Sequence, residues 1–147
     1  KVFGTPCADI ADGEKRGVFG YVEQSFRPVP GTVGEQISLF DESMSGEKIR
    51  AAARLAGLDE MIMELPEGYD TPFREELFSR GQAQLLSIAR AVAADPEILL
   101  LDEITANLDS GTEKAVLDAI GAAAKNRTVL SVSHRLYRQG DSVVAQM

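Results

Sequence analysis

The chain has 147 residues, a formal net charge of −8 and 44% hydrophobic residues, which is enough apolar material to bury one core. The acidic balance argues against sequence-independent binding of nucleic acid, because such binding depends on a basic surface. The single cysteine, Cys7, leaves no partner for an internal disulfide, and no apolar stretch approaches the roughly 20 residues of a membrane-spanning helix.

The first elements that we expect are a short strand and a turn-rich stretch. The sequence begins irregularly and then becomes apolar at 18–22, which predicts a strand that delivers Gln24 at its end. Pro28, Pro30 and Gly31 mark turns, and a helix is predicted over 47–56, where Gly57 stops it.

A longer helix is predicted over 83–94, with Ser79 near its N-cap. Its apolar residues recur at helical spacing, and they are Leu85, Ile88, Ala89 and Val92. A helix N-terminus offers unpaired N–H groups, Ser79 adds a hydroxyl, and Gly81 allows backbone to approach closely. Residues 78–82 are therefore a candidate phosphate site, and the alternative is a helix cap without a ligand.

The apolar run 98–101 ends in two adjacent carboxylates, Asp102 and Glu103. An unbroken apolar run suits a parallel strand buried on both faces, and open α/β sheets bind ligands at the carboxyl ends of their strands. One carboxylate can hold Mg²⁺ while the next polarises a water, which is the chemistry of nucleotide hydrolysis. The alternative is a buried strand followed by a solvated acidic turn.

The last third of the chain predicts a crossover back to the same sheet. Ser110 and Glu113 have the spacing of a capping box, which starts a helix with apolar residues at 116, 117 and 120. The strand 128–132 then ends at His134, the only histidine of the chain. Because His134 follows a second strand at the same sheet edge, we expect a functional rather than a structural role. A turn at 140–141 leads to a short strand at 142–145.

Five motifs in this order resemble the nucleotide-binding domain of the ATP-binding cassette (ABC) transporters. They are similar to the family's Q-loop, signature motif, Walker B strand with its catalytic glutamate, D-loop and H-loop, and they lie at 21–24, 78–82, 98–103, 106–109 and 133–134. The resemblance implies an α/β fold of the P-loop NTPase (RecA-like) class. In that fold a parallel sheet, formed by 1–24 and 95–147, carries an inserted α-helical subdomain at 25–94.

The phosphate loop of the family, Walker A, is missing, because no Gly-x-x-x-x-Gly-Lys-Ser/Thr occurs in the sequence. We therefore expect an incomplete sheet, a C-terminal portion of a longer polypeptide, and no activity of this portion alone. In the resembled fold the missing strand lies beside 128–132. We expect that unpaired edge either to dimerise or to pair with 142–145.

The resemblance also implies roles for the catalytic residues and the cofactors ATP and Mg²⁺. Asp102 would hold Mg²⁺ through water, and Gln24 would complete the shell of the metal and the attacking water. Glu103 would act as the general base, and His134 would bond the γ-phosphate.

A second set of residues would serve a second nucleotide-binding domain that faces this one head to tail. Ser79, Arg80, Gly81 and Gln82 would bind the γ-phosphate of the ATP held there, and Asp109 would carry communication between the two sites. Arg80 stands where the family usually has glycine. It either adds a contact to phosphate or crowds the close approach that glycine allows.

Two further stretches, 31–37 and 65–71, resemble exporter-type cassettes. This implies an ATPase at the cytoplasmic face of the cell membrane, partnered by a transmembrane domain and not by nucleic acid. Two alternatives stay open: a soluble ABC ATPase that is not coupled to transport, and a non-catalytic partner module.

Overall fold

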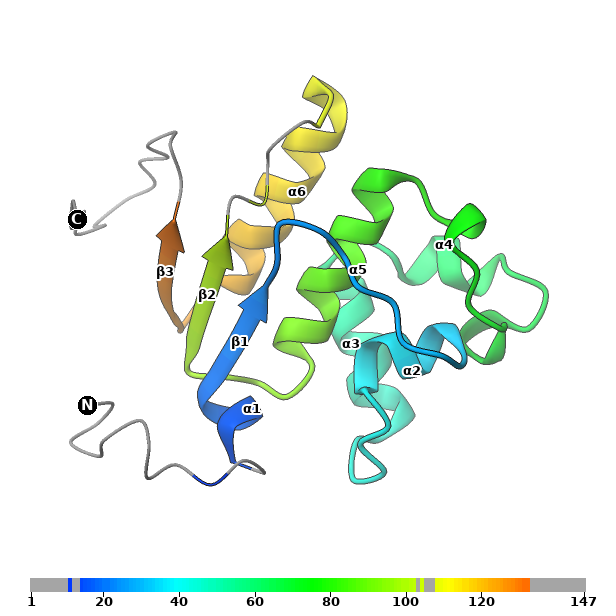
Figure 1. Cartoon of the computed structure of the whole chain (residues 1–147), viewed down its shortest axis with the longest axis horizontal. Helices are drawn as coiled ribbons and strands as arrows, with labels where there is room; N and C mark the ends of the chain where they lie inside the picture. The colour runs from blue at the N-terminus through cyan, green and yellow to red at the C-terminus, as the bar shows by residue number, and fades with distance from the viewer. Residues whose placement is uncertain (1–10, 12–13, 103, 105–107, 133–147) are drawn as a thin grey trace.

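The structure is a computed structural model that describes residues 11, 14–102, 104 and 108–132. A three-stranded parallel sheet stands at one side of the molecule, and a group of helices extends from its edge (Figure 1). The strands are β1 (Phe19–Val22), β2 (Ile98–Asp102) and β3 (Thr128–Val132). The helices are α1 (Lys15–Val18), α2 (Val33–Ser38), α3 (Gly46–Leu55), α4 (Asp59–Met63), α5 (Arg80–Val92) and α6 (Ser110–Ala123), with 3-10 turns at Gly68–Asp70 and Glu75–Leu77.

The sheet has the order β1-β2-β3, with Val22 beside Leu101 and Leu101 beside Ser131. Of the four predicted strands, the three that lie in the described ranges are present within a residue or two of their expected bounds, which confirms the parallel α/β class. Side chains alternate across the sheet: Leu99 and Leu101 are buried, whereas Leu100 is half-buried. We expected β2 to be buried on both faces. Among the described residues this expectation is wrong, because only one face of β2 is buried. The alternation leaves Leu100 on the side opposite the helices.

One face of the sheet packs on helices, and the other carries exposed apolar side chains. Tyr21 and Leu130, which flank Leu100 in register, are 49% and 56% exposed. Within the described ranges, β3 pairs with β2 alone. The strand predicted at 142–145 lies outside those ranges, so its pairing with β3 and the alternative of dimerisation both stay predictions.

Helix α5 is the central element, because it contacts β1, α2, α3 and α6 (Figure 1). Leu86, Ile88 and Ala89 are almost completely buried on it. Ser79 is its N-cap, as predicted, although the helix starts at Arg80 and so includes the rest of the candidate phosphate segment.

Gly20 sets how closely β1 approaches α5. A Cβ atom at Gly20 would lie 2.6 Å from the carbonyl oxygen of Ala91, 2.7 Å from Leu99 and 2.8 Å from Pro96. No side chain larger than hydrogen fits there without displacing the strand from the helix, because all three distances are shorter than ordinary van der Waals contact.

The helices between β1 and α5 begin and end at residues suited to those positions. Thr32 and Glu35 form a capping box at α2, Ser45 caps α3, and Gly57 follows α3 with a φ of 75°. The predicted stop at Gly57 is thereby confirmed. None of the helices in the described ranges is both long and apolar enough to cross a lipid bilayer.

Asp59 links α3, α4 and the turn at Gly68–Asp70. Its carboxylate accepts hydrogen bonds from Arg50 Nε at 2.9 Å, Arg54 Nε at 3.1 Å and the Tyr69 hydroxyl at 2.8 Å. Burial acts to raise the pKa of Asp59, but the hydrogen bonds from Arg50, Tyr69 and Arg54 outweigh it and leave the pKa below its ordinary value.

The N-cap predicted for the last helix is wrong by one residue. Asp109, not Ser110, caps α6, because its Oδ1 accepts hydrogen bonds from the amides of Gly111 and Thr112, each at 3.1 Å. Aspartate and serine are about equally good N-caps, so the choice depended on which side chain reaches the free amides.

Candidate functional site

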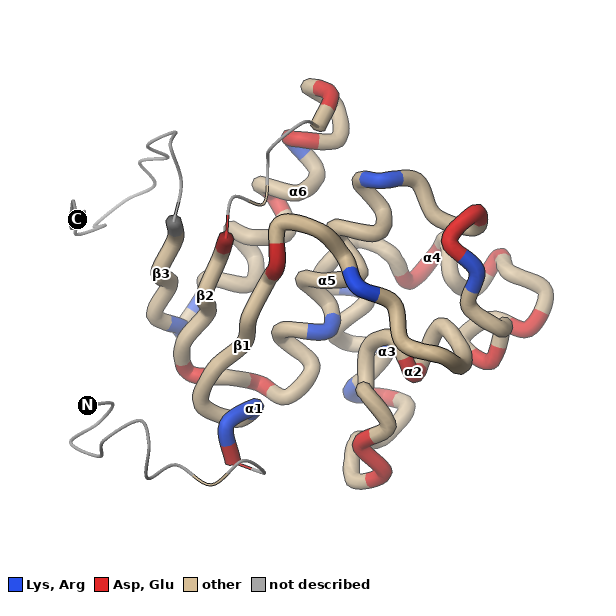
Figure 2. The backbone as a smooth tube through the Cα atoms, in the orientation of Figure 1, with Lys and Arg blue, Asp and Glu red and all other residues tan. Residues whose placement is uncertain are grey.

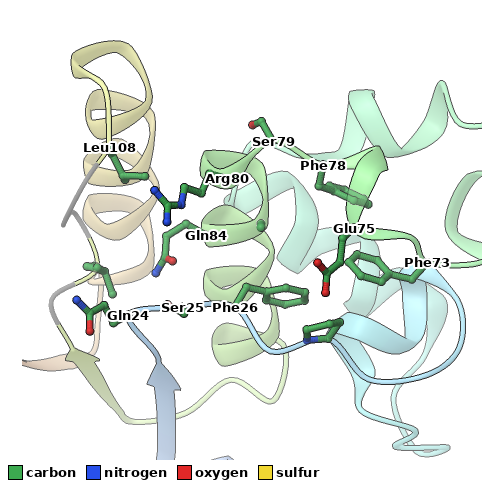
Figure 3. Close-up of a pocket in the computed structure, with 13 residues that line it drawn as sticks. Gln24, Ser25, Phe26, Phe73, Glu75, Phe78, Ser79, Arg80, Gln84 and Leu108 are labelled. Carbon is green, nitrogen blue, oxygen red and sulfur yellow. The ribbon is translucent and has the colours of Figure 1, made fainter.

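A cleft of about 370 Å³ lies between the loop that follows β1 and the start of α5 (Figure 3). Gln24, Ser79 and Arg80 all contribute to its wall, so three predicted site residues from two distant segments face the same space. Arg80 extends between Leu108 and Gln84 in this view. Three aromatic residues also line the cleft: Phe26, Phe73 and Phe78.

Hydrogen bonds between its own residues hold the predicted phosphate segment in a capping box. Ser79 Oγ accepts from the amide of Gln82 at 3.2 Å, and Gln82 Oε1 accepts from the amide of Ser79 at 2.8 Å. Gly81 is buried, and a Cβ atom there would overlap the methyl group of Thr112 on α6. The side chains of Ser79 and Arg80 are exposed, whereas Gln82 is engaged in the cap.

A second group of predicted residues lies at the carboxyl edge of the sheet. Acidic positions stand at the carboxyl ends of both β1 and β2 (Figure 2). Asp102 is the last residue of β2 and is half-buried, and Gln24 is exposed two residues beyond β1. Glu103 and His134, the predicted general base and γ-phosphate contact, lie outside the described residues.

Tyr21 adds a contact to this edge that the sequence did not predict. Its hydroxyl donates to Oδ2 of Asp102 at 3.1 Å, from β1 to β2. This hydrogen bond is the main reason why the pKa of Tyr21 is raised, since the phenol donates only while protonated. The bond restrains the orientation of the Asp102 carboxylate.

The donor atoms at this edge suit the predicted magnesium ion. A carboxylate and an amide carbonyl are hard oxygen ligands, and Mg²⁺ is usually held by one or two protein carboxylates together with substrate phosphates. The described ranges contain no group of three or more acidic, histidine or cysteine side chains that would form an all-protein metal cage. The oxygen atoms of Asp102 and Gln24 are of the type that magnesium prefers.

Asp109, which is predicted to carry communication between the two ATP sites, is exposed and caps α6. The hydrogen bonds that it accepts from Thr112, and then from Gly111, lower the pKa of its carboxyl group. Its N-cap position places it next to Gly111 and Thr112, and Thr112 in turn contacts Gly81.

Three polar residues were missed by the sequence analysis: Gln36 and Gln84, which are buried, and Arg90, which is half-buried. Their side chains hold the backbone of the loop that carries Gln24. A signal for Gln84 was present, because it lies on the same helical face as the buried Ile88 and Ala91, at positions i+4 and i+7. A polar residue on such a face needs a hydrogen-bond partner.

A parallel sheet with a carboxylate and an amide at its carboxyl edge, next to a capped helix N-terminus, is the arrangement of α/β proteins that bind phosphate ligands. The fold and the site thus place the chain among α/β proteins that bind phosphate ligands at the carboxyl edge of a parallel sheet.

Comparison with known proteins specifies the class further. A family model described as ABC transporter matches residues 2–106. The putative ABC transporter ATP-binding protein exp8 of Streptococcus pneumoniae is 42% identical over 130 residues, which are 87% of this chain and 22% of that protein. The mycobactin import ATP-binding/permease protein IrtA of Mycolicibacterium smegmatis is 45% identical over 119 residues, which are 80% of this chain and 14% of that protein.

A solved structure gives the same result. The structure of a bacterial Atm1-family ABC exporter with ATP bound matches with a TM-score of 0.72 and 35% sequence identity, covering 90% of this chain and 23% of that one. The chain belongs to the ABC transporter family, and the predicted similarity to exporter-type nucleotide-binding domains is confirmed. It spans less than a quarter of the length of these relatives.

Proposed function

We propose that this chain is part of the ATP-hydrolysing domain of an exporter-like ABC transporter and that it powers the movement of a substrate across a membrane. Two observations support the proposal: Gln24 lines one cleft together with Ser79 and Arg80, and Asp102 ends β2 at the carboxyl edge of the sheet. These residues come from segments far apart in the sequence, and each matches a motif of the family.

In the proposed reaction, Asp102 holds the magnesium ion of Mg-ATP through water, with its carboxylate restrained by Tyr21. Bound magnesium neutralises part of the charge that develops on the phosphates. Gln24 orients the attacking water, Glu103 accepts its proton as general base, and His134 donates a hydrogen bond to the γ-phosphate. The roles of Glu103 and His134 rest on the sequence motifs alone.

A second nucleotide-binding domain completes the site in this proposal. Ser79 and Arg80 reach its γ-phosphate with their exposed side chains, Gly81 contributes a backbone N–H group of the first turn of α5, and Gln82 holds Ser79 through the capping box. The guanidinium of Arg80 adds a charge-assisted contact to phosphate. Asp109 relates the two sites because it caps α6, whose Thr112 contacts Gly81.

The partner that receives the work is a transmembrane domain, which places this chain at the cytoplasmic face of the cell membrane. We assign residues 25–94 to a helical subdomain and residues 1–24 and 95–147 to part of the ATPase core.

The test measures Mg-ATP binding by calorimetry and ATP hydrolysis in the longer protein that contains this chain. We expect Glu103→Gln to bind Mg-ATP without turnover and Asp102→Asn to weaken the Mg²⁺ dependence of binding. Glu97→Gln is the matched control, because Glu97 is exposed just before the opposite end of the same strand. Since the 147 residues contain no phosphate-loop motif, we expect no hydrolysis from them alone.

Two outcomes would replace the proposal. Failure of the longer protein to bind ATP would identify a non-catalytic partner module. Hydrolysis by a longer protein that has no membrane-spanning segment would identify a soluble ABC ATPase instead.

A further inference from the structure

The loop that carries Gln24 is attached to α5 on both sides of that residue. Before Gln24, the side-chain amide of Gln84 donates to the carbonyl oxygen of Glu23 at 2.9 Å. After it, Nη1 of Arg90 donates to the carbonyl oxygen of Arg27 at 2.8 Å. Both bonds end on backbone atoms, so they fix the path of the loop whatever side chains it carries.

Arg90 makes further contacts that fix its own position. Its Nε donates to the carbonyl oxygen of Gln36 at 2.6 Å, and its guanidinium carbon lies 4.4 Å from the centre of the Phe26 ring. The side chain of Gln36 accepts from the amide of Val29 and donates to its carbonyl oxygen, each at 2.8 Å. We call Gln36, Gln84 and Arg90 the loop clamp.

Two of the three clamp residues are buried and Arg90 is half-buried, which makes most of their hydrogen bonds costly to break. Gln36 is fully buried and Gln84 is 4% exposed. Burial lowers the pKa of Arg90 to about 10, so the guanidinium stays charged at neutral pH and donates charge-assisted hydrogen bonds. A buried donor or acceptor that loses its partner pays its full desolvation cost.

We propose that Gln84 and Arg90 are positioning residues that fix Gln24 relative to Ser79, through helix α5, which Ser79 caps. This inference deepens the proposed function and rests on it. A shift of the loop by about 1 Å would move Gln24 away from the metal and water, while a shift of α5 would carry Gln24 and Ser79 together. The clamp thereby makes Gln24, which faces the metal in the proposed function, and Ser79, which belongs to the signature motif, move together.

The first test needs no nucleotide, and it measures hydrogen exchange of residues 23–30 in the longer protein that contains this chain. Gln84→Leu removes the amide donor, and Arg90→Lys keeps the charge but lacks the planar fork whose Nε and Nη1 reach the carbonyl groups of Gln36 and Arg27. We expect exchange of this segment to rise about tenfold in both variants, from the loss of a buried hydrogen bond. Ser87→Ala is the control, because Ser87 is as buried as Gln84 on the same helix but is not part of the clamp.

The second test measures kcat and KM for ATP. We expect kcat to fall roughly tenfold to a hundredfold at nearly constant KM, because misplacement by about 1 Å has effects of that size. Since the clamp acts through Gln24, adding Gln84→Leu to Gln24→Ala should cause little further loss. Multiplicative losses would overturn the proposal, and so would unchanged exchange of residues 23–30 or an equal rise over Gly46–Leu55.

These two tests separate the clamp from the proposed function. If the unaltered protein hydrolyses no ATP, the proposed function fails and the exchange measurement alone decides whether the clamp exists. If it hydrolyses ATP and the variants behave like Ser87→Ala, the proposed function stands and the clamp is refuted.

Discussion

Replacing Gly20 by alanine tests whether the close contact between β1 and α5 holds the site together. The new Cβ atom would meet three neighbours closer than 3.0 Å, and one of them, the carbonyl oxygen of Ala91, belongs to the backbone of α5. A backbone atom cannot turn aside as a side chain can, so the strand must move away from the helix. Overpacking of a core costs about 1–3 kcal/mol, and we expect a loss near the upper end.

The assay is thermal unfolding of the longer protein that contains this chain, compared with Gly17→Ala. A Cβ at Gly17 has no neighbour within 4 Å, and Gly17 lies in α1, so this control should be neutral or slightly stabilising. At about 2–4 °C per kcal/mol for a domain of this size, Gly20→Ala should lower Tm by about 6–12 °C. Equal Tm values for the two variants would refute the argument that β1 requires a glycine against α5.

Three further predictions concern the helix contacts around the site. Gly81→Ala should destabilise the protein by about 1–2 kcal/mol, and Thr112→Ser, which removes the overlapping methyl group, should recover most of that loss in a double-mutant cycle; additive effects would contradict the contact. Asp109→Ala should lower Tm while Asp109→Asn retains it, since asparagine also caps helices; equal losses would contradict the cap. Because the folded pKa of Asp59 is depressed, its contribution to stability is present above the unfolded value of about 3.9 and is lost as the pH falls through the folded value. The Tm difference between the unaltered protein and Asp59→Asn should therefore shrink between pH 7 and pH 3, and a constant difference would contradict this assignment.

Local patterns were enough to predict the strands and the long helix. The run before Asp102 has four apolar residues with no helical spacing, and α5 has apolar residues at helical spacing behind a serine that caps it. These features act within a few residues of one another, so they can be recognised without knowledge of the tertiary structure. Gly57 could be recognised in the same way, because glycine is common just after the C-cap of a helix, where it adopts a positive φ as it does after α3.

Contacts between distant segments could not be predicted in this way. Gln84 and Glu23 are 61 positions apart, and Arg90 and Arg27 are 63 positions apart. The buried polar face of α5 indicated that a partner was needed but not which carbonyl would supply it. The cap of α6 was missed for a smaller reason, since Asp109 and Ser110 are both good N-caps and only the path of the backbone decides between them.

The pairing of Phe19 with Ile98 also constrains the order in which the chain folds. These neighbours in the sheet are 79 positions apart, and closing a flexible loop of that length costs about 4 kcal/mol of entropy. During synthesis at about 5–20 residues per second, β1 leaves the ribosome roughly 4–16 s before its partner strand. Folding of α2, α3 and α5 in that interval would shorten the loop to be closed and would give β1 a surface to pack on. The segment between the two strands then serves as the template on which the sheet is assembled.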